Sequence, residues 1–167
     1  FIPGTYTDGH ASGNVFTVFS APKPQKLYCS FVFMLNAGFP FHPISNKFIW
    51  MVPGQLLIQL QETIRWLHAE HLDGSQWLDN VIGPVNGATL HTYNNDAVST
   101  GVWHNLEFVL DRPAGTWQIW LDGSLRLNAS GITITDPEFD EFLITGHRGG
   151  GGETLATDGY WYYDHVH

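Results

Sequence analysis

Hydrophobic and polar residues alternate with a period of two along several short segments of the chain, which is the pattern of half-buried β-strands. The clearest segment is 103–111, in which apolar side chains occupy every second position. A short turn at 113–115 and the pair Asp122-Gly123 separate it from two more alternating segments. Because such short connections join antiparallel neighbours, the pattern predicts a three-stranded antiparallel meander over residues 103–127.

Other runs that are rich in β-branched and aromatic residues predict further strands. They cover residues 15–19, 27–35, 47–52, 55–63, 88–93, 132–135, 142–145 and 161–166. Residues 62–71 fit a helical stripe as well as a strand, and we interpret them as a strand because Thr63, Ile64 and Trp66 favour one. About ten to twelve strands with no clear helix predict an all-β fold, an antiparallel β-sandwich of the jelly-roll type. The length fits one domain over residues 1–167.

The net charge limits the partners that fit this domain. Seven Lys and Arg against sixteen Asp and Glu give a formal charge of −9. A negative field repels phosphate backbones and anionic membranes, so nucleic acid is not an expected partner. The chain has no run of about 18 consecutive apolar residues, so no membrane span is predicted. Neutral sugars carry no such electrostatic penalty.

The cysteine content carries little functional information. Cys29 is the only cysteine, so the chain forms no internal disulfide. It lies within the apolar run 27–35, where we expect a buried and unreactive thiol. Asn128 begins a glycosylation sequon, which has meaning only in a eukaryotic or viral source.

Three motifs near the end of the chain recur in the same order in a known superfamily. They are Trp103-His104-Asn105-Leu106-Glu107-Phe108, Gly115-Thr116-Trp117-Gln118-Ile119-Trp120-Leu121-Asp122-Gly123 and Gly159-Tyr160-Trp161-Tyr162-Tyr163-Asp164-His165-Val166. With these motifs the chain resembles the concanavalin A-like lectin and glucanase superfamily, which includes laminin-G-like modules. The resemblance implies a jelly roll in which one concave sheet carries the ligand groove. The superfamily contains lectins, glycoside hydrolases and polysaccharide lyases, so the likeness alone does not choose among these functions.

Asn105, Glu107, Gln118 and Trp120 form the first candidate site. If the apolar positions of the meander face the core, these four residues face outward on neighbouring strands. A Trp ring stacks on the apolar face of a sugar, while amides and carboxylates bond the sugar hydroxyl groups. The four residues therefore predict glycan binding on the concave sheet. The alternative is a Trp packed under a loop beside a solvated Glu.

The last predicted strand suggests a second aromatic surface. An inward-facing Val166 leaves Trp161, Tyr163 and His165 on the outward side of that strand. Arg148 precedes a run of four glycines, and we expect it in a mobile loop at the rim of the groove. These outward residues and Arg148 are further candidate ligands for a glycan.

No metal or cofactor is predicted. His165 and His167 are two positions apart, and His68 and His71 are three apart, but no third ligand is visible near either pair. A structural calcium ion held by loop oxygens is an alternative in this fold, although no acidic loop motif marks a site for it.

An enzymatic function is the main alternative to a binding function. Retaining glucanases of this superfamily carry a Glu-x-Asp-x-Glu strand, whereas residues 138–142 read Glu-Phe-Asp-Glu-Phe and lack the second catalytic Glu. An alginate-lyase-like enzyme needs basic and aromatic side chains to neutralise a uronate and remove its proton. Lys47, Arg148, His91 and Tyr163 are of the required types, but the motifs of those lyases are absent.

The sequence therefore predicts a lectin-like, non-catalytic module that binds a glycan or polysaccharide at an extracellular or cell-surface location. Two alternatives stay open. One is a polysaccharide lyase or glycoside hydrolase of the same fold. The other is a structural subunit of an extracellular filament or viral assembly, a homo-oligomer, because an aromatic and weakly charged composition suits large buried interfaces.

Overall fold

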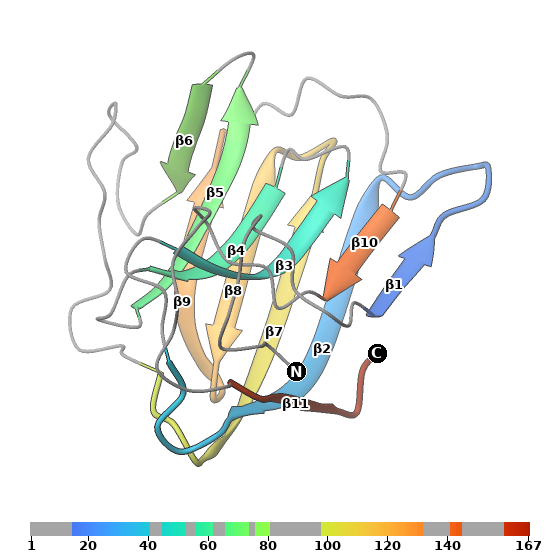
Figure 1. The fold of residues 1–167 in the computed structure, drawn as a ribbon. Coiled ribbons are helices and arrows are strands. Elements are labelled where there is room, and N and C mark those ends of the chain that lie inside the picture. Colours follow the sequence, from blue (N-terminus) through green and yellow to red (C-terminus); the bar gives the residue numbers. More distant parts are fainter. Residues whose placement is uncertain are drawn as a thin grey trace.

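The part of the chain that the computed structural model describes forms eleven strands in two antiparallel sheets (Figure 1). It comprises residues 15–40, 45–52, 56–61, 66–73, 76–80, 98–131, 141–144 and 159–167. The six-stranded sheet has the order β1 (Val15–Val18), β10 (Glu141–Ile144), β3 (Ser45–Val52), β4 (Leu56–Gln61), β5 (Trp66–Asp73) and β6 (Gln76–Asn80). The five-stranded sheet has the order β11 (Trp161–Asp164), β2 (Lys26–Leu35), β7 (Trp103–Asp111), β8 (Thr116–Leu121) and β9 (Ser124–Ser130). The predicted all-β sandwich is confirmed.

The predicted meander of β7, β8 and β9 is confirmed as well, and its last turn follows from the local sequence. The β8–β9 connection has positive φ angles of 52° at Asp122 and 73° at Gly123. A two-residue hairpin of type I′ requires positive φ at both central residues, which is why an Asp-Gly pair is favoured there. This hairpin fixes where the side chain of Asp122 lies relative to β7.

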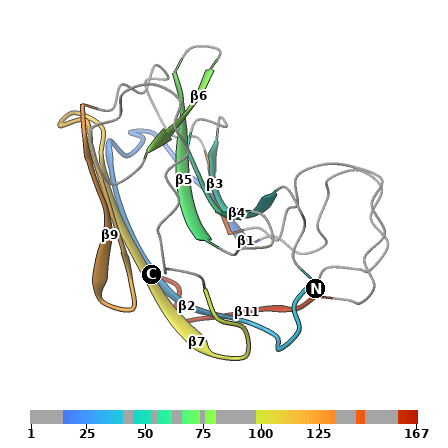
Figure 2. The same ribbon diagram turned by 90° about the vertical axis from the view of Figure 1, so that its left-hand side faces the viewer.

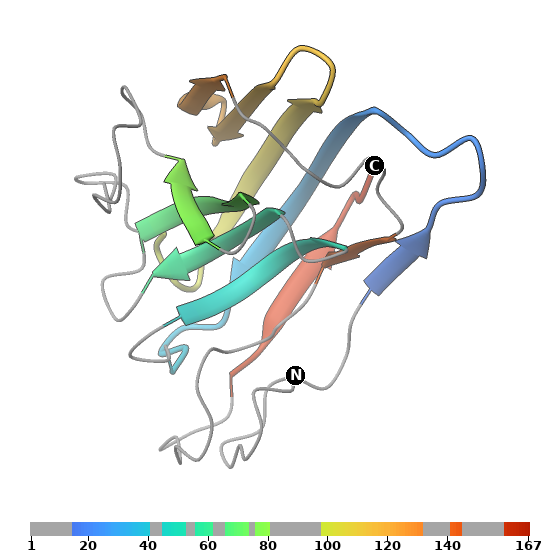
Figure 3. The same cartoon turned by 90° about the horizontal axis from the view of Figure 1, so that it is seen from above.

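The two sheets form the layers of the sandwich, and the five-stranded sheet bends around the other one. Figure 2 shows β2 and β7 as a bow, with the six-stranded sheet on its inner side. The outward face of the five-stranded sheet is therefore convex. In Figure 3 the C-terminal strand β11 runs beside β2, in agreement with the pairing of Tyr162 with Met34. The last residue continues this edge, because His167 and Ser30 exchange both backbone hydrogen bonds, at 2.8 and 3.1 Å.

The core lies between the sheets and takes every second residue of the central strands. β7 and β8 alternate between buried and half-buried positions along their length. Phe31, Phe108 and Trp117 are among the largest fully buried side chains, and Ile49 of β3 belongs to the same cluster. Burying one such side chain contributes about 1.5–3 kcal/mol. Residues of the opposite parity on the five-stranded sheet point away from this core, and together they form the outer face of that sheet.

Some sequence predictions differ from the structure, and others fall outside the described residues. Residues 66–73 are strand β5, so the strand interpretation of the 62–71 segment is confirmed from residue 66 onward, and residues 62–65 lie outside the described residues. The sequence pattern does not predict β6, because Gln76–Asn80 contains two adjacent apolar residues and no alternation. The expected strands at 88–93 and 132–135 lie outside the described residues.

Candidate functional site

The first candidate site forms one patch on the outer face of the five-stranded sheet. Glu107 of β7 pairs directly with Trp120 of β8. Asn105 and Gln118 lie two residues away from them on the same two strands, on the same face. All four side chains are half-buried, whereas their immediate neighbours on β7 and β8 are buried. The predicted outward parity of these residues is confirmed.

Hydrogen bonds fix the polar side chains of this patch. Asn105 Nδ2 donates to Glu107 Oε1 at 2.7 Å, and the Tyr28 hydroxyl of β2 donates to Glu107 Oε2 at 3.3 Å. Gln118 Nε2 donates to Asn128 Oδ1 of β9 at 3.0 Å. A carboxylate offers about four lone-pair positions, so Glu107 can accept further bonds from the hydroxyl groups of a ligand while these contacts hold it.

The structure differs from the sequence prediction in the curvature of this surface. The four residues were expected on a concave sheet, but they lie on the convex side of the bow that Figure 2 shows. A convex face presents aromatic rings to a ligand that lies across it, and it does not enclose the ligand. The role of the four residues as glycan ligands stays a prediction.

The second candidate surface, on β11, has the opposite parity from the one predicted. Trp161 is buried, and Tyr163 packs against the core with its hydroxyl oxygen buried, while Tyr162 is exposed. The prediction used Val166 to set the parity, but β11 ends two residues earlier, and His165 has a φ of 49° that breaks the alternation. Trp161 and Tyr163 are therefore core residues, which corrects the prediction of an outward platform.

The remaining predicted ligands are not brought to the patch by any described contact. His165 is exposed, and its Nδ1 atom lies 3.1 Å from Oδ2 of Asp164. Arg148 lies outside the described residues, as does His91, which the lyase alternative uses. That alternative also uses Tyr163, but burial raises the pKa of its hydroxyl far above the usual value because the charged form is poorly solvated there. A buried hydroxyl of this kind does not reach a polysaccharide on the surface.

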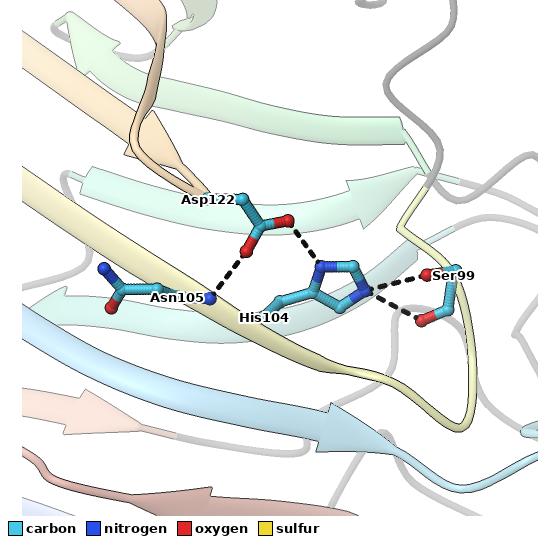
Figure 4. Close-up of polar contacts among 4 residues, drawn as sticks. All are labelled: Ser99, His104, Asn105 and Asp122. Carbon is cyan, nitrogen blue, oxygen red and sulfur yellow. Dashed lines mark hydrogen bonds and ion pairs between the residues drawn. The ribbon is translucent and has the colours of Figure 1, made fainter.

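Ser99, His104 and Asp122 form a polar cluster that sequence analysis did not predict (Figure 4). His104 Nδ1 lies 2.7 Å from Asp122 Oδ2, and His104 Nε2 lies 3.0 Å from Ser99 Oγ. The other carboxylate oxygen of Asp122 accepts the backbone N–H of Asn105 at 2.8 Å. His104 and Asp122 belong to two of the motifs that carry the superfamily resemblance, so these motifs meet in space. Their recurrence was the sequence signal for this contact.

Contacts from a Ser to a His and from that His to an Asp also occur in serine hydrolases, but the geometry here fits a structural role. The carbonyl oxygen of Ser99 lies 3.1 Å from His104 Nε2. A carbonyl oxygen only accepts, so Nε2 faces this acceptor as well as the Ser99 hydroxyl and is not dedicated to the proton of that hydroxyl. His104 is also buried against Phe33, with ring centroids 5.6 Å apart. The cluster joins the loop before β7 to the β8–β9 turn, and we call these three residues the clamp.

An apolar pocket of about 220 Å³ lies between the two sheets beside the last residues of the chain. Phe19, Leu27, Cys29, Phe108 and Phe142 are among the residues that line it. Burial raises the pKa of the Cys29 thiol to about 12, so the thiol is neutral at physiological pH, and the expected buried cysteine is confirmed. A sugar needs several hydrogen-bonding groups, so we do not assign glycan binding to this pocket.

The six-stranded sheet carries a row of polar residues at paired positions on three strands. Lys47 of β3 pairs with Gln59 of β4, and Gln59 pairs with His68 of β5. Ile49, which is buried, pairs with Ile58. Ile58 and Gln59 are successive residues of β4 and so lie on opposite faces, and the register of β3 shifts between Lys47 and Ile49. The row is therefore on the face opposite to Ile49. The row therefore lies on the side of this sheet that is turned away from the core.

Within the described ranges, no group of three or more His, Cys, Asp and Glu residues is placed to hold a metal ion. No helix in the same part of the chain is long and apolar enough to cross a membrane.

Several solved structures of carbohydrate-active and carbohydrate-binding proteins have a similar fold. The endo-β-1,4-glucuronan lyase from the fungus Trichoderma reesei matches with a TM-score of 0.65 at 19% sequence identity, over 97% of this chain and 76% of that chain. The carbohydrate-binding module CBM66 from Bacillus subtilis matches with a TM-score of 0.54 at 9% identity, over 94% and 82%. The Caenorhabditis elegans galectin LEC-6 matches with a TM-score of 0.55 at 12% identity, over 97% and 94%.

Similarity at such low identity establishes the fold alone, and this fold is the jelly roll that the superfamily resemblance implies. No protein-family model matches the sequence, and no curated protein matches it. The structural neighbours include binding proteins and lyases, so they support the concanavalin A-like fold and do not select one member family.

Proposed function

We propose that this chain is a carbohydrate-binding module that recognises a polysaccharide on the outer face of its five-stranded sheet. The observation that carries the proposal is the pairing of Trp120 with Glu107, a carboxylate that Asn105 and Tyr28 hold in position. The indole ring offers a flat apolar surface to a sugar ring. Glu107, together with the amides of Asn105 and Gln118, offers acceptors and donors to the sugar hydroxyl groups.

The charge of the outer face supports a neutral glycan as the ligand. Glu107, Asp111 and Asp164 are on this face with Lys26, and Lys26 is paired with Asp111 at 2.6 Å. With a formal charge of −9 on the whole chain, an anionic polysaccharide meets repulsion on approach. The fold similarity to a carbohydrate-binding module and to a galectin supports a carbohydrate ligand, and a secreted location is part of the proposal.

Affinity electrophoresis through gels that contain soluble neutral polysaccharides tests this function. At least one polysaccharide is expected to retard the wild-type chain, and Trp120→Ala is expected to weaken that binding about tenfold because the stacking surface is lost. Val18→Ala is the matched control, since Val18 is an exposed apolar residue on the other sheet. If no polysaccharide retards the wild type, or if Trp120→Ala migrates as the wild type does, the proposal is wrong.

A polysaccharide lyase that acts on a uronate polymer is the second candidate function, and the row of Lys47, Gln59 and His68 favours it. In β-elimination a base removes the proton on C5, and the electrons of that bond form a C4–C5 double bond. The bond from C4 to the linking oxygen then breaks, and this oxygen takes up a proton. Lys is of the kind that balances the charge of a uronate carboxylate, Gln is of the kind that donates hydrogen bonds to it, and His is of the kind that takes the proton. Fold similarity to the glucuronan lyase supports this substrate class.

The absorbance of unsaturated uronate products tests the lyase candidate. On this hypothesis the wild type produces such absorbance from a polyuronate such as glucuronan, and His68→Ala abolishes it. The control is His167→Ala, an exposed histidine beyond β11 on the other sheet, which is expected to keep full activity. No absorbance from the wild type, or full activity in His68→Ala, removes the candidate.

A further inference from the structure

Aromatic side chains continue along the outer face from the proposed site towards the edge of the sheet. Trp103 of β7 is 50% exposed and Tyr162 of β11 is 43% exposed. Both residues pair with Met34 of β2, so they lie in one row across the sheet and on one face. Trp103 also has the same parity on β7 as Glu107, the partner of Trp120. The row therefore shares the outer face with the proposed site.

Tyr160 extends this row, and its backbone is held firmly. The rings of Tyr160 and Tyr162 are stacked, with centroids 6.4 Å apart and planes inclined by 24°. The N–H of Tyr160 donates to Asn36 Oδ1 at 2.7 Å, and its carbonyl oxygen accepts the N–H of Asn36 at 3.0 Å. A platform that is already ordered loses less conformational entropy when a ligand binds.

The spacing of the aromatic residues exceeds what one sugar ring can cover. Trp103 and Glu107 are four residues apart on β7, which corresponds to about 14 Å along the strand. Tyr162 is two strands away from Trp103, about 10 Å across the sheet. Asn105, an amide, lies between the two rows on β7. Rings and hydrogen-bonding groups therefore alternate over a distance of several sugar units.

We propose that Trp120, Trp103, Tyr162 and Tyr160 form one track that binds the interior of an extended, neutral polysaccharide chain. This inference rests on the proposed function and specifies its ligand: a chain several sugars long, and not a single sugar or a chain end. The convex shape of the face suits such a ligand, because a chain that lies across a sheet needs no walls. Asp164 and Glu107 on the same face disfavour a uronate or sulfated polymer by repulsion.

Calorimetric titration with an oligosaccharide series tests the track. The series runs from the disaccharide to the hexasaccharide of whichever neutral polysaccharide binds the wild type. Wild-type affinity is expected to rise with length until the ligand spans the track. Trp103→Ala and Tyr162→Ala are each expected to lose about tenfold in affinity for the hexasaccharide and nothing for the disaccharide. Trp120→Ala is expected to lose affinity at every length.

Val102→Ala is the matched control, because Val102 is 50% exposed and adjacent to Trp103. It is expected to bind every oligosaccharide as the wild type does. Affinity that does not depend on length, or unchanged hexasaccharide affinity in both Trp103→Ala and Tyr162→Ala, overturns the track; the proposed function then still stands if Trp120→Ala loses binding. A wild type that binds no member of the series and no polysaccharide overturns both.

Discussion

The Nδ1 atom of His104 lies 2.7 Å from the Oδ2 atom of Asp122, and this contact joins the start of β7 to the β8–β9 turn. The same carboxylate accepts the backbone N–H of Asn105, whose carbonyl oxygen accepts the N–H of Asp122 at 2.8 Å. Asn105 in turn donates to Glu107. The clamp therefore positions the strand that carries the proposed glycan site without contacting the ligand.

Removing the carboxylate of the clamp is expected to destabilise the fold. Asp122→Ala loses two hydrogen bonds and puts an alanine at a φ of 52°, so the free energy of unfolding is expected to fall by about 2 kcal/mol. Asp122→Asn, which keeps one acceptor oxygen and tolerates positive φ, is expected to lose less. Urea unfolding measures both variants, and equal stability of Asp122→Ala and the wild type contradicts the clamp.

Replacing Ser99 tests whether the cluster is a clamp or a hydrolytic site. Ser99→Ala is expected to hydrolyse an activated ester at the same background rate as the wild type, because His104 is buried and its Nε2 atom also faces a carbonyl oxygen. Release of nitrophenol from nitrophenyl acetate measures the rate. A wild-type rate far above that of Ser99→Ala means that the cluster is catalytic.

The hydroxyl of Tyr163 is buried and has no hydrogen-bond partner among the described residues. Leaving a buried polar group unpaired costs roughly 1–3 kcal/mol, so Tyr163→Phe is expected to raise the free energy of unfolding by about 1 kcal/mol. Tyr162→Phe serves as the control, because Tyr162 is exposed and its replacement is expected to change little. Destabilisation of Tyr163→Phe, measured by thermal or urea unfolding, shows that the hydroxyl has a partner.

Stability is expected to fall at alkaline pH. Burial raises the pKa of Cys29 from 9.0 to about 12 and raises that of Tyr163 above its usual value of 10.0. In each case folding favours the neutral form, so the stabilisation is complete below the unfolded pKa and is lost as the pH rises through the folded one. For Cys29 the loss therefore falls between pH 9 and about 12.

Urea unfolding at a series of pH values measures this dependence. Cys29→Ala and Tyr163→Phe are each expected to flatten the slope of unfolding free energy against pH, since each removes one group that ionises only in the unfolded chain. A slope that is the same in the wild type and in both variants contradicts the assignment.

The alternation of apolar and polar residues in β7 and β8 correctly predicts which side chains face outward. Its apolar positions recur over several consecutive pairs, and a one-residue slip exposes all of them at once, so one register is strongly preferred. That is why the outward faces of Trp120 and Glu107 could be predicted. The curvature of the sheet could not be predicted, because it depends on how the two sheets pack and not on the local pattern.

The errors on β11 and β6 have local physical causes. The parity of β11 was inferred from Val166, which lies beyond the strand and after the positive φ of His165. β6 has too few apolar positions to show a period. Its pairing with β5 makes it a strand, and the local sequence does not show this pairing. The contact between His104 and Asp122 joins positions 18 residues apart, which local patterns do not connect. The only sequence signal for it is that both residues belong to motifs that recur together in the superfamily.

Mapping amide and indole NMR signals during titration with a bound neutral polysaccharide locates the face of the domain that binds the glycan. The shifts are expected to concentrate on the indole N–H of Trp120 and on the side-chain amides of Asn105 and Gln118. The row of Lys47, Gln59 and His68 is expected to stay unperturbed. Shifts confined to β3, β4 and β5, with Trp120 unchanged, would contradict the assignment of glycan binding to the outer face of the five-stranded sheet.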